Sequence, residues 1–232
     1  HGGGQALWDE LYAEFGLKAF LAGGSGVQMG GWFQKEINSL ADLKGLKMRI
    51  PGLGAEVVNR MGVTAVNMPG GEIMPALQSG VIDATEWVGP WNDLAFGFHK
   101  IAKFYYGPGF HEPSSSLEVM LSKDKFDALP SDLKAIVEAA CTAEANYTVS
   151  EFTAGNNISQ TTLVEEHGVT IGNFPDDVVK TAFANAVDVV QETASEGDIA
   201  KRIFDSWWSF RTDAVKRAPY AEQGYMNNRA LG

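Results

Sequence analysis

The amino-acid sequence predicts an α/β fold with parallel-dominated sheets, two lobes and a long helix that bridges them. Short strand and helix patterns alternate between residues 46 and 85, which is typical of a right-handed parallel arrangement. A helical pattern from Pro130 to about Glu166 is too long for one lobe. The chain has 232 residues, enough for one large domain or for two lobes of about 100 residues each.

The N-terminal region predicts a helix, a strand and a glycine-rich crossing. Residues 5–15 carry apolar side chains at helical spacing and end at Gly16, and residues 18–22 have a strand pattern. Residues 23–32 are rich in glycine, but the glycines match neither a dinucleotide-binding fingerprint nor a phosphate-binding loop. A backbone this flexible could approach a ligand closely, and it could equally be a plain linker between lobes.

The stretch from Asn38 to Pro51 predicts one helical turn followed by a strand. Ser39 and Asp42 have the spacing of a short capping box, and Gly45 ends the turn. One face of the strand is apolar, with Leu46, Met48 and Ile50. Arg49 has the opposite parity and falls at the carboxyl end of the strand, where open α/β sheets bind their ligands. It is a candidate receptor for a carboxylate, and the alternative is a solvated arginine at a strand edge.

A second unit of the same kind follows along the chain. The patterns predict helices over 56–61 and 71–78 and strands over 63–68 and 81–85. Glu86 and Trp87 come directly after the last of these strands. We therefore expect them at the same sheet edge as Arg49.

Residues 103–122 predict two more strands. The first spans 103–106 and is broken by Gly107, Pro108 and Gly109. The second spans 114–122, and its pattern is that of a buried strand with one carboxylate, Glu118, inside it. Glu118 points to the face opposite Leu117 and Val119, which is either solvent or a binding site.

The C-terminal third is predicted to be largely helical. The long helix from Pro130 is expected to be interrupted near residues 155–157, and a strand over 168–172 and a helix over 175–195 follow. A final helix over 198–217 carries the aromatic residues Phe204, Trp207, Trp208 and Phe210. These side chains either pack on their own lobe or form a dimer contact.

Composition excludes several classes of partner. The formal charge is -11 and no basic run is present, so a nucleic-acid surface is excluded and an anionic membrane is disfavoured. The longest apolar runs are far shorter than about 18 residues, and residues 1–4 show no targeting signal. The single Cys141 fits a small buried residue in a helix, which suits a reducing compartment or a disulfide-free periplasmic protein.

The motifs of catalysis are missing from the sequence. It contains no H-E-x-x-H, no C-x-x-C and no nucleophile elbow, and its four histidines have no metal-ligand spacing to cysteine or aspartate. What remains is a set of oxygen ligands with one cation and one aromatic residue, Gln28, Glu86, Glu118, Arg49 and Trp87. If they converge on an anionic ligand, the net charge is about -2, and each like-charge pair at 4 Å costs about 4 kcal/mol. Such a site needs a hard cation such as Na⁺ or Ca²⁺.

Several stretches resemble the substrate-binding proteins of tripartite ATP-independent periplasmic (TRAP) transporters. The similar segments are Ser39–Pro51, Ala76–Ala84, Leu129–Leu133 and the long helix that follows. The resemblance extends over nearly the whole chain, and these segments occur in a consistent order. Residues 28–32, Glu86 with Trp87, and Leu117 with Glu118 are similar to the branch that binds lactate or 2-oxo acids such as pyruvate through a bound cation.

The resemblance implies a periplasmic-binding-protein-like receptor, not an enzyme, that closes on a small carboxylate and delivers it to a TRAP membrane permease. It implies that Arg49 forms the salt bridge to the ligand carboxylate, with Gln28 and Trp87 beside the ligand. It also implies that Gln28, Glu86, the Trp87 carbonyl and Glu118 hold the Na⁺ or Ca²⁺. The implied location is the periplasm, and the C-terminal helix is available for a homodimer.

The resemblance also implies a division into lobes. Residues 1–26 and 115–154 are expected in lobe I, residues 27–114 and 155–196 in lobe II, and residues 197–232 in a C-terminal helical segment. Relatives are longer at the N-terminus by well over about 100 residues, the size of a lobe. We therefore expect the remainder of lobe I to be missing from this sequence, as in a fragment or a partial sequence.

Two other functions use the same residues. A related receptor would bind a dicarboxylate or a sugar acid, and it would need a second basic anchor near Arg49, where the sequence has Met29 and Gly30. A metal-assisted lyase or aldolase would use Glu86 or Glu118 as the base and Arg49 to hold a keto acid. Turnover separates the enzyme from the receptors.

Overall fold

The computed structural model describes residues 2–232, so His1, the first residue of predicted lobe I, lies outside the described residues. The chain divides into two compact units. The small unit comprises the residues up to Ala19, Met120–Ala128 and Val190–Gly232, and the large unit comprises Phe20–Val119 and Leu129–Val189. The predicted lobe boundaries stay a prediction.

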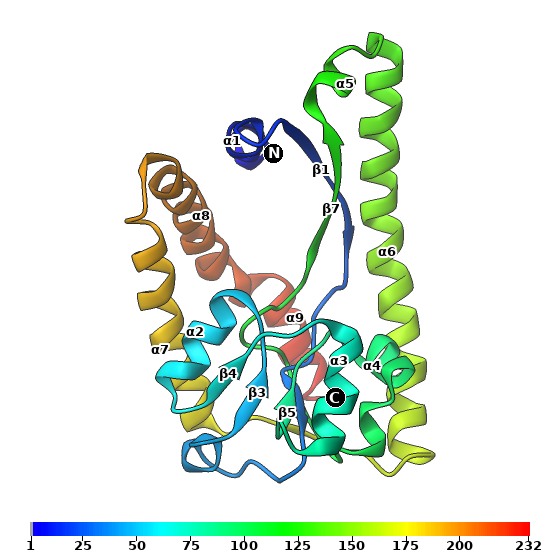
Figure 1. The fold of residues 1–232 in the computed structure, drawn as a ribbon, viewed down its shortest axis with the longest axis vertical. Coiled ribbons are helices and arrows are strands. Elements are labelled where there is room, and N and C mark those ends of the chain that lie inside the picture. Colours follow the sequence, from blue (N-terminus) through cyan, green and yellow to red (C-terminus); the bar gives the residue numbers. More distant parts are fainter. Residues whose placement is uncertain (1) are drawn as a thin grey trace. The chain divides into compact units, whose positions relative to one another are not determined.

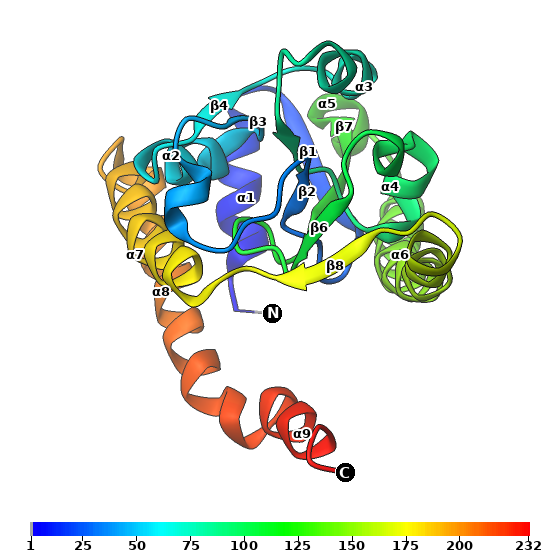
Figure 2. The same cartoon turned by 90° about the horizontal axis from the view of Figure 1, so that it is seen from below.

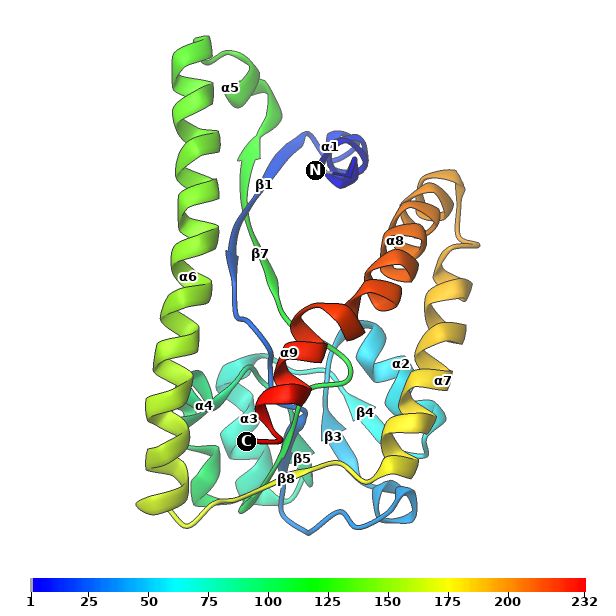
Figure 3. The ribbon, with the colours of Figure 1, turned by 180° about the vertical axis from the view of Figure 1, so that it is seen from behind.

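The small unit is helical. It contains α1 (Gly4–Ala13), α5 (Lys123–Asp127), α8 (Asp198–Arg217), a short 3₁₀ helix (Ala218–Tyr220) and α9 (Glu222–Arg229). Helices α1 and α8 are in contact, and Arg202 of α8 forms an ion pair with Glu10 of α1. The sequence prediction of α8 as the final helix was wrong, because α9 follows it at the C-terminus (Figure 3).

The large unit contains a six-stranded mixed sheet in the order β4-β3-β5-β2-β6-β8. Its strands are β2 (Gly31–Phe33), β3 (Lys47–Arg49), β4 (Thr64–Val66), β5 (Ala84–Thr85), β6 (Phe104–Gly107) and β8 (Thr170–Asn173). Strands β3 and β4, β3 and β5, and β6 and β8 are parallel, whereas β2 is antiparallel to both of its neighbours. Strands β3, β5 and β6 therefore end at one edge of the sheet, where β2 begins. We call it the carboxyl edge.

Helices cover both faces of this sheet. They are the 3₁₀ helix Leu40–Leu43, α2 (Gly52–Arg60), α3 (Gly70–Ser79), α4 (Pro90–Phe96), the 3₁₀ helix Phe98–Lys100, α6 (Ser131–Glu165) and α7 (Asp176–Thr193). One buried cluster joins the sheet to α2 and α7, and a second joins it to α3 and α6 (Figure 2). The sheet is buried between the two clusters, and this fixes the residues at its carboxyl edge.

The predicted helical turn at Ser39 is confirmed. The Ser39 backbone N–H donates to Asp42 Oδ2 at 2.9 Å, so the two residues form a capping box at the start of the 3₁₀ helix. Gly45 follows with a φ of 77°, a left-handed conformation that glycine adopts at little cost. The chain then enters β3 in the register that the apolar side chains predicted.

Two strands outside this sheet, β1 (Leu17–Gly24) and β7 (Ser116–Ser122), pair with each other (Figure 1). The prediction that β7 is buried was wrong. Leu117 is 46% and Val119 is 39% exposed, whereas Glu118 between them is half-buried. The physical reason is the alternation of side chains along the strand, which places Leu117 and Val119 on the open face of β7 and Glu118 on the more covered one.

Helix α6 runs without a break through residues 155–157, so the predicted interruption was wrong. A Cβ atom at Gly155 would lie 2.7 Å from Cδ2 of Trp91, and Asn156 Oδ1 accepts a hydrogen bond from the Trp91 backbone N–H at 3.0 Å. These two residues allow α4 to pack closely on α6 and do not end the helix. No helix among residues 2–232 is long and apolar enough to cross a membrane.

Candidate functional site

Arg49 lies at the end of β3 with its guanidinium held by the neighbouring strand end. The side chain is largely buried, and Nη1 donates to Glu86 Oε1 at 2.5 Å and to the Glu86 carbonyl at 3.3 Å. Nε donates to the Met68 carbonyl at 3.3 Å. Within the described part of the chain these bonds use only Nε and Nη1, so the two Nη2 hydrogens are available to a ligand.

Glu86 follows β5 and is 2% exposed. Its backbone N–H donates to the Arg49 carbonyl at 3.1 Å, which extends the pairing of β3 and β5 by one residue. One carboxylate oxygen accepts from Arg49, and the other lies 3.2 Å from His111 Nε2. A buried carboxylate is costly unless it is paired, and here a guanidinium and an imidazole lie on its two sides.

The ring of Trp87 packs against the guanidinium of Arg49. The Cζ atom of Arg49 lies 5.1 Å from the centre of the Trp87 ring, which is cation–π geometry. The ring lies against Gly70 at the start of α3, where a Cβ atom would come within 2.7 Å of Trp87 Cη2. A side chain at position 70 would therefore displace the ring from Arg49.

Gln28 lies three residues before β2. Because β2 runs antiparallel to β5 and β6, the residues that precede it lie at the carboxyl edge. It is 2% exposed, and its amide Nε2 donates to Ser25 Oγ at 3.1 Å and to Ser115 Oγ at 2.6 Å. The Ser115 hydroxyl donates to Glu112 Oε1 at 3.0 Å. The amide oxygen of Gln28 is buried and has no hydrogen-bond partner among the described residues. A buried oxygen of this kind is a vacant acceptor position.

Glu86, His111 and Glu112 are the one group of three potential metal ligands found in the described part of the chain. One ligand atom from each lies within 4.8 Å of the others. With Gln28 Oε1, the donor set is mainly carboxylate and amide oxygen, which suits Na⁺, Ca²⁺ or Mg²⁺ better than zinc or copper. The arrangement can therefore accommodate a hard cation beside the guanidinium of Arg49.

The structure brings Arg49, Glu86 and Trp87 into direct contact. Gln28 is connected to them through Ser115 and Glu112. Glu118 lies on β7, three residues beyond Ser115, and does not belong to the group of potential metal ligands. Its assignment as a cation ligand stays a prediction.

Sequence reasoning missed four polar residues of this site, namely Ser25, His111, Glu112 and Ser115. Two of them, His111 and Glu112, lie in the loop after β6, which ends at the carboxyl edge like β3 and β5. The signal that could have found them is the same one that pointed to Arg49: a polar segment that directly follows a buried strand. The signal is weak here because Gly107, Pro108 and Gly109 separate most of the strand from these residues.

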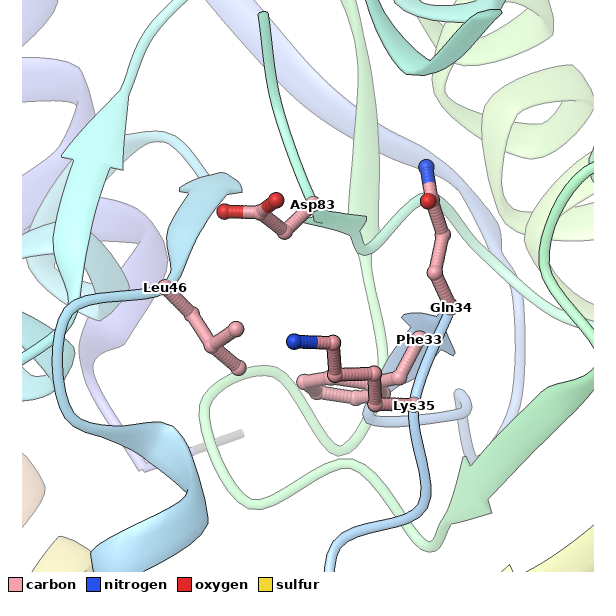
Figure 4. Close-up of a pocket in the computed structure, with 5 residues that line it drawn as sticks. All are labelled: Phe33, Gln34, Lys35, Leu46 and Asp83. Carbon is pink, nitrogen blue, oxygen red and sulfur yellow. The ribbon is translucent and has the colours of Figure 1, made fainter. Parts of the chain in front are cut away.

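A small hollow lies at the opposite edge of the same sheet. It is lined by Phe33, Gln34, Lys35, Leu46 and Asp83 (Figure 4). Its volume of about 30 Å³ has room for little more than a water molecule. It is therefore no alternative to the carboxyl edge as a ligand site.

The family model for bacterial extracellular solute-binding proteins, family 7 (DctP), matches residues 2–196 of the chain. The chain belongs to the DctP family. The similarity to TRAP solute-binding proteins that the sequence indicated is thereby confirmed, as is the α/β binding-protein fold. Members of this family are solute-binding proteins, which is a receptor role.

Three relatives are similar to this chain in sequence, and two of them have known structures. The monocarboxylate 2-oxoacid-binding periplasmic protein of Nostoc sp. is 43% identical over 227 residues, which are 97% of this chain and 62% of the relative. A TRAP solute-binding protein from Pseudoalteromonas atlantica with bound sodium and pyruvate is 38% identical with a TM-score of 0.90, over 98% of this chain and 69% of that one.

A TRAP solute-binding protein from Bordetella bronchiseptica is 35% identical with a TM-score of 0.94, over 100% of this chain and 68% of that one. It is a mixed-occupancy dimer with calcium and picolinate in one active site. The DctP chain described here thus spans about three fifths of the length of the Nostoc protein.

Proposed function

We propose that this DctP chain belongs to an extracytoplasmic receptor that binds a small monocarboxylate, either lactate or a 2-oxo acid such as pyruvate, together with a cation. The observation that carries the proposal is the buried guanidinium of Arg49, with both Nη2 hydrogens available, beside an incomplete set of oxygen ligands. The relatives that bind 2-oxo acids, pyruvate or picolinate support the same ligand class.

Charge explains why the carboxylate needs a cation. Glu86 and Glu112 carry two negative charges against one on Arg49, and a ligand carboxylate raises the deficit to two. Like charges at 4 Å repel by about 4 kcal/mol at a surface-like dielectric, so the deficit would oppose binding. A Ca²⁺ ion would cancel it and a Na⁺ ion would halve it. The relatives with bound sodium and pyruvate, or with bound calcium and picolinate, support either ion.

The pairing of Arg49 with Glu86 couples the binding of the cation to the binding of the carboxylate. While Glu86 accepts the guanidinium, the strongest donor of the site is partly used. A cation on Glu86 would weaken that pairing and turn Arg49 toward the ligand, which it can hold with two parallel hydrogen bonds. Cation and carboxylate should therefore each raise the affinity for the other.

The proposed cation ligands are Gln28 Oε1, a carboxylate oxygen of Glu86, the Trp87 carbonyl and one further carboxylate. Glu118 is the residue expected from the sequence. Glu112 is the competing candidate because it lies within 4.8 Å of the Glu86 ligand atom and is hydrogen-bonded through Ser115 to Gln28. Variants of the two glutamates separate these assignments.

Delivery to a TRAP permease in the periplasm and assembly as a homodimer belong to this proposal. The exposed aromatic side chains of α8 support a dimer contact, since Phe210 is 72% and Trp207 is 44% exposed. The dimer of the Bordetella relative supports the same state.

A receptor for a dicarboxylate or a sugar acid is the second candidate, because His111 offers a basic group beside Glu86 that sequence reasoning had not placed there. Its Nδ1 atom has no hydrogen-bond partner among the described residues and could contact a second carboxylate. Competition between pyruvate and a 2-oxo dicarboxylate for the same site distinguishes the two candidates. The monocarboxylate proposal requires pyruvate to bind more tightly.

Native mass spectrometry of the full-length protein as purified tests the proposal. We expect a small monocarboxylic acid and a Na⁺ or Ca²⁺ ion to accompany each chain, with two chains in the complex. Titration of the stripped protein with pyruvate, lactate and a sugar acid then ranks the ligands. A protein that binds none of the monocarboxylates with either cation present would overturn the proposal.

A further inference from the structure

Asp93 is a buried carboxylate close to the site that the proposed function does not use. It lies in α4 and is 1% exposed. Oδ1 accepts hydrogen bonds from the backbone N–H groups of Val88 and Gly89, both at 3.1 Å. Oδ2 accepts from Trp32 Nε1 at 2.8 Å and from the Tyr105 hydroxyl at 2.7 Å. Each carboxylate oxygen therefore has two donors.

None of these four donors carries a charge. A buried ionised group without a counter-ion is costly, and a site that only needed a filled core would do better with an apolar side chain. Burial raises the pKa of Asp93 to about 6, against the four hydrogen bonds that lower it, so the carboxylate is ionised at neutral pH. The burial of an ionised carboxylate among four uncharged donors is therefore not explained by core packing alone.

The two backbone donors belong to the segment that directly follows Glu86 and Trp87. The same segment is tied to the opposite wall of the site, because the Val88 carbonyl accepts from the Met29 backbone N–H at 3.0 Å. Met29 is the neighbour of Gln28. Asp93 thus holds a peptide segment that joins the Glu86–Trp87 side of the site to the Gln28 side.

The two side-chain donors give the carboxylate a rigid support. Trp32 and Tyr105 are fully buried on the adjacent strands β2 and β6, and their rings stack with centres 3.9 Å apart. The Trp32 and Tyr105 hydrogen bonds therefore hold Asp93 against the centre of the sheet. The position of the Val88–Gly89 backbone relative to the sheet follows from these four bonds.

We propose that Asp93 is a positioning residue for the cation site: it fixes the distance between the Trp87 carbonyl and Gln28, and thereby the affinity for the cation. This inference rests on the proposed function. A hard cation requires its oxygen ligands at nearly fixed distances, and loss of a supporting hydrogen bond behind the ligands typically lowers metal affinity about 10- to 100-fold. Asp93 touches neither the cation nor the carboxylate.

The experiment compares Asp93→Asn with wild type in the full-length protein. Asparagine keeps the shape but can accept on only one side, because its NH₂ group faces two donors on the other. We expect calorimetric titration with Ca²⁺ alone to show an affinity about tenfold weaker, with an unchanged number of sites per folded chain. Pyruvate affinity at saturating Ca²⁺ should change by less than about threefold.

The matched control is Leu163→Ala, which opens a cavity in the same buried cluster as Trp32 and Tyr105 and removes no hydrogen bond to Asp93. It should lower the melting temperature and leave the Ca²⁺ affinity of the folded chains unchanged. If Asp93→Asn does the same as Leu163→Ala, Asp93 is only structural and the inference is wrong.

Two further results keep the test decisive. If Asp93→Asn does not fold, Tyr105→Phe removes one of the four hydrogen bonds, and unchanged Ca²⁺ affinity in that variant overturns the inference. If wild type binds neither Ca²⁺ nor pyruvate, the proposed function fails, and the inference fails with it. Normal wild-type binding with a normal Asp93→Asn affinity contradicts the inference alone.

Discussion

Glu86 and Asp93 are two buried carboxylates, seven residues apart, that the fold treats in opposite ways. Glu86 is surrounded by ionisable groups, Arg49 on one oxygen and His111 on the other. Asp93 is surrounded by four neutral donors that occupy both of its oxygens. The first arrangement can exchange partners when a charged ligand arrives, whereas the second is complete without one.

Unused hydrogen-bonding capacity distinguishes the surroundings of Glu86 from those of Asp93. Around Glu86 there are groups with unused capacity, such as the Gln28 amide oxygen and His111 Nδ1, which have no partner among residues 2–232. Around Asp93 the hydrogen bonds are saturated. At this site the groups with vacant positions are the ones we assign to the ligands, and the saturated Asp93 is the one we assign to support.

The substitution with the largest expected effect is Arg49→Ala, which removes the charged partner of Glu86. We expect loss of measurable pyruvate binding, since the ligand loses a charge-assisted pair and Glu86 loses its guanidinium, a change that costs about 3–5 kcal/mol for a buried ion pair. Calorimetry with Ca²⁺ present measures the effect. Arg60→Ala, an exposed arginine on α2, is the control and should bind as wild type does. Unchanged binding in Arg49→Ala would refute its assigned role.

The pH dependence of stability tests the environment of Asp93. In the unfolded chain this group ionises near pH 3.8, whereas burial raises its pKa in the folded state to about 6. Between these values the folded state keeps a proton that the unfolded state releases, so the free energy of unfolding falls as the pH rises. At about 1.4 kcal/mol per unit of pKa, the total loss is about 3 kcal/mol.

Urea unfolding of wild type and Asp93→Asn at pH 4 and pH 7 isolates this contribution. Asparagine does not ionise, so the stability advantage of wild type over the variant should be greater at pH 4 than at pH 7. A difference that is the same at both pH values would show that Asp93 has the same pKa in the folded and unfolded chains.

A third test decides whether Glu112 or Glu118 is the second carboxylate ligand of the cation beside Glu86. If Glu112 completes the cation site, Glu112→Gln should weaken Ca²⁺ binding about 10- to 100-fold, because an amide replaces a charged ligand. Glu118→Gln would then change it little. The reverse result would support the assignment expected from the sequence. Equal, small effects would exclude both glutamates as ligands.

The smallest expected effect concerns the Trp87 ring. Trp87→Leu keeps the backbone carbonyl but removes the aromatic face 5.1 Å from the Arg49 guanidinium. We expect pyruvate affinity to fall by about 0.5–2 kcal/mol, the range of a cation–π contact, with Ca²⁺ affinity preserved. A loss of Ca²⁺ binding instead would mean that the ring supports the cation ligands as well.

Local patterns carried much of the fold prediction. The Ser39–Asp42 capping box and the strand that ends at Arg49 depend on residues within a few positions of each other, and the structure has both. Gly155 could not be interpreted locally, because its purpose is to receive the ring of Trp91, which lies 64 residues earlier in the chain. A glycine needed for packing and a glycine that ends a helix have the same sequence signal.

The candidate site was predictable only where a residue directly follows a strand. Arg49, Glu86 and Trp87 share that position, and the parallel pairing of β3 and β5 brings them together. Glu112 reaches the site through a loop whose path is set by Ser115 and Gln28, across a separation of 87 residues. Asp93 acquires its partners from three separate elements, so no short motif could indicate its role.

The most direct test of the central claim is the cation dependence of pyruvate binding by the full-length protein, measured by calorimetry after removal of bound ions with a chelator. We expect pyruvate to bind only weakly without Na⁺ or Ca²⁺, and added Ca²⁺ to raise the affinity at least about tenfold, because the ion offsets the negative charge of the site. Tight pyruvate binding that is unaffected by either ion would contradict it.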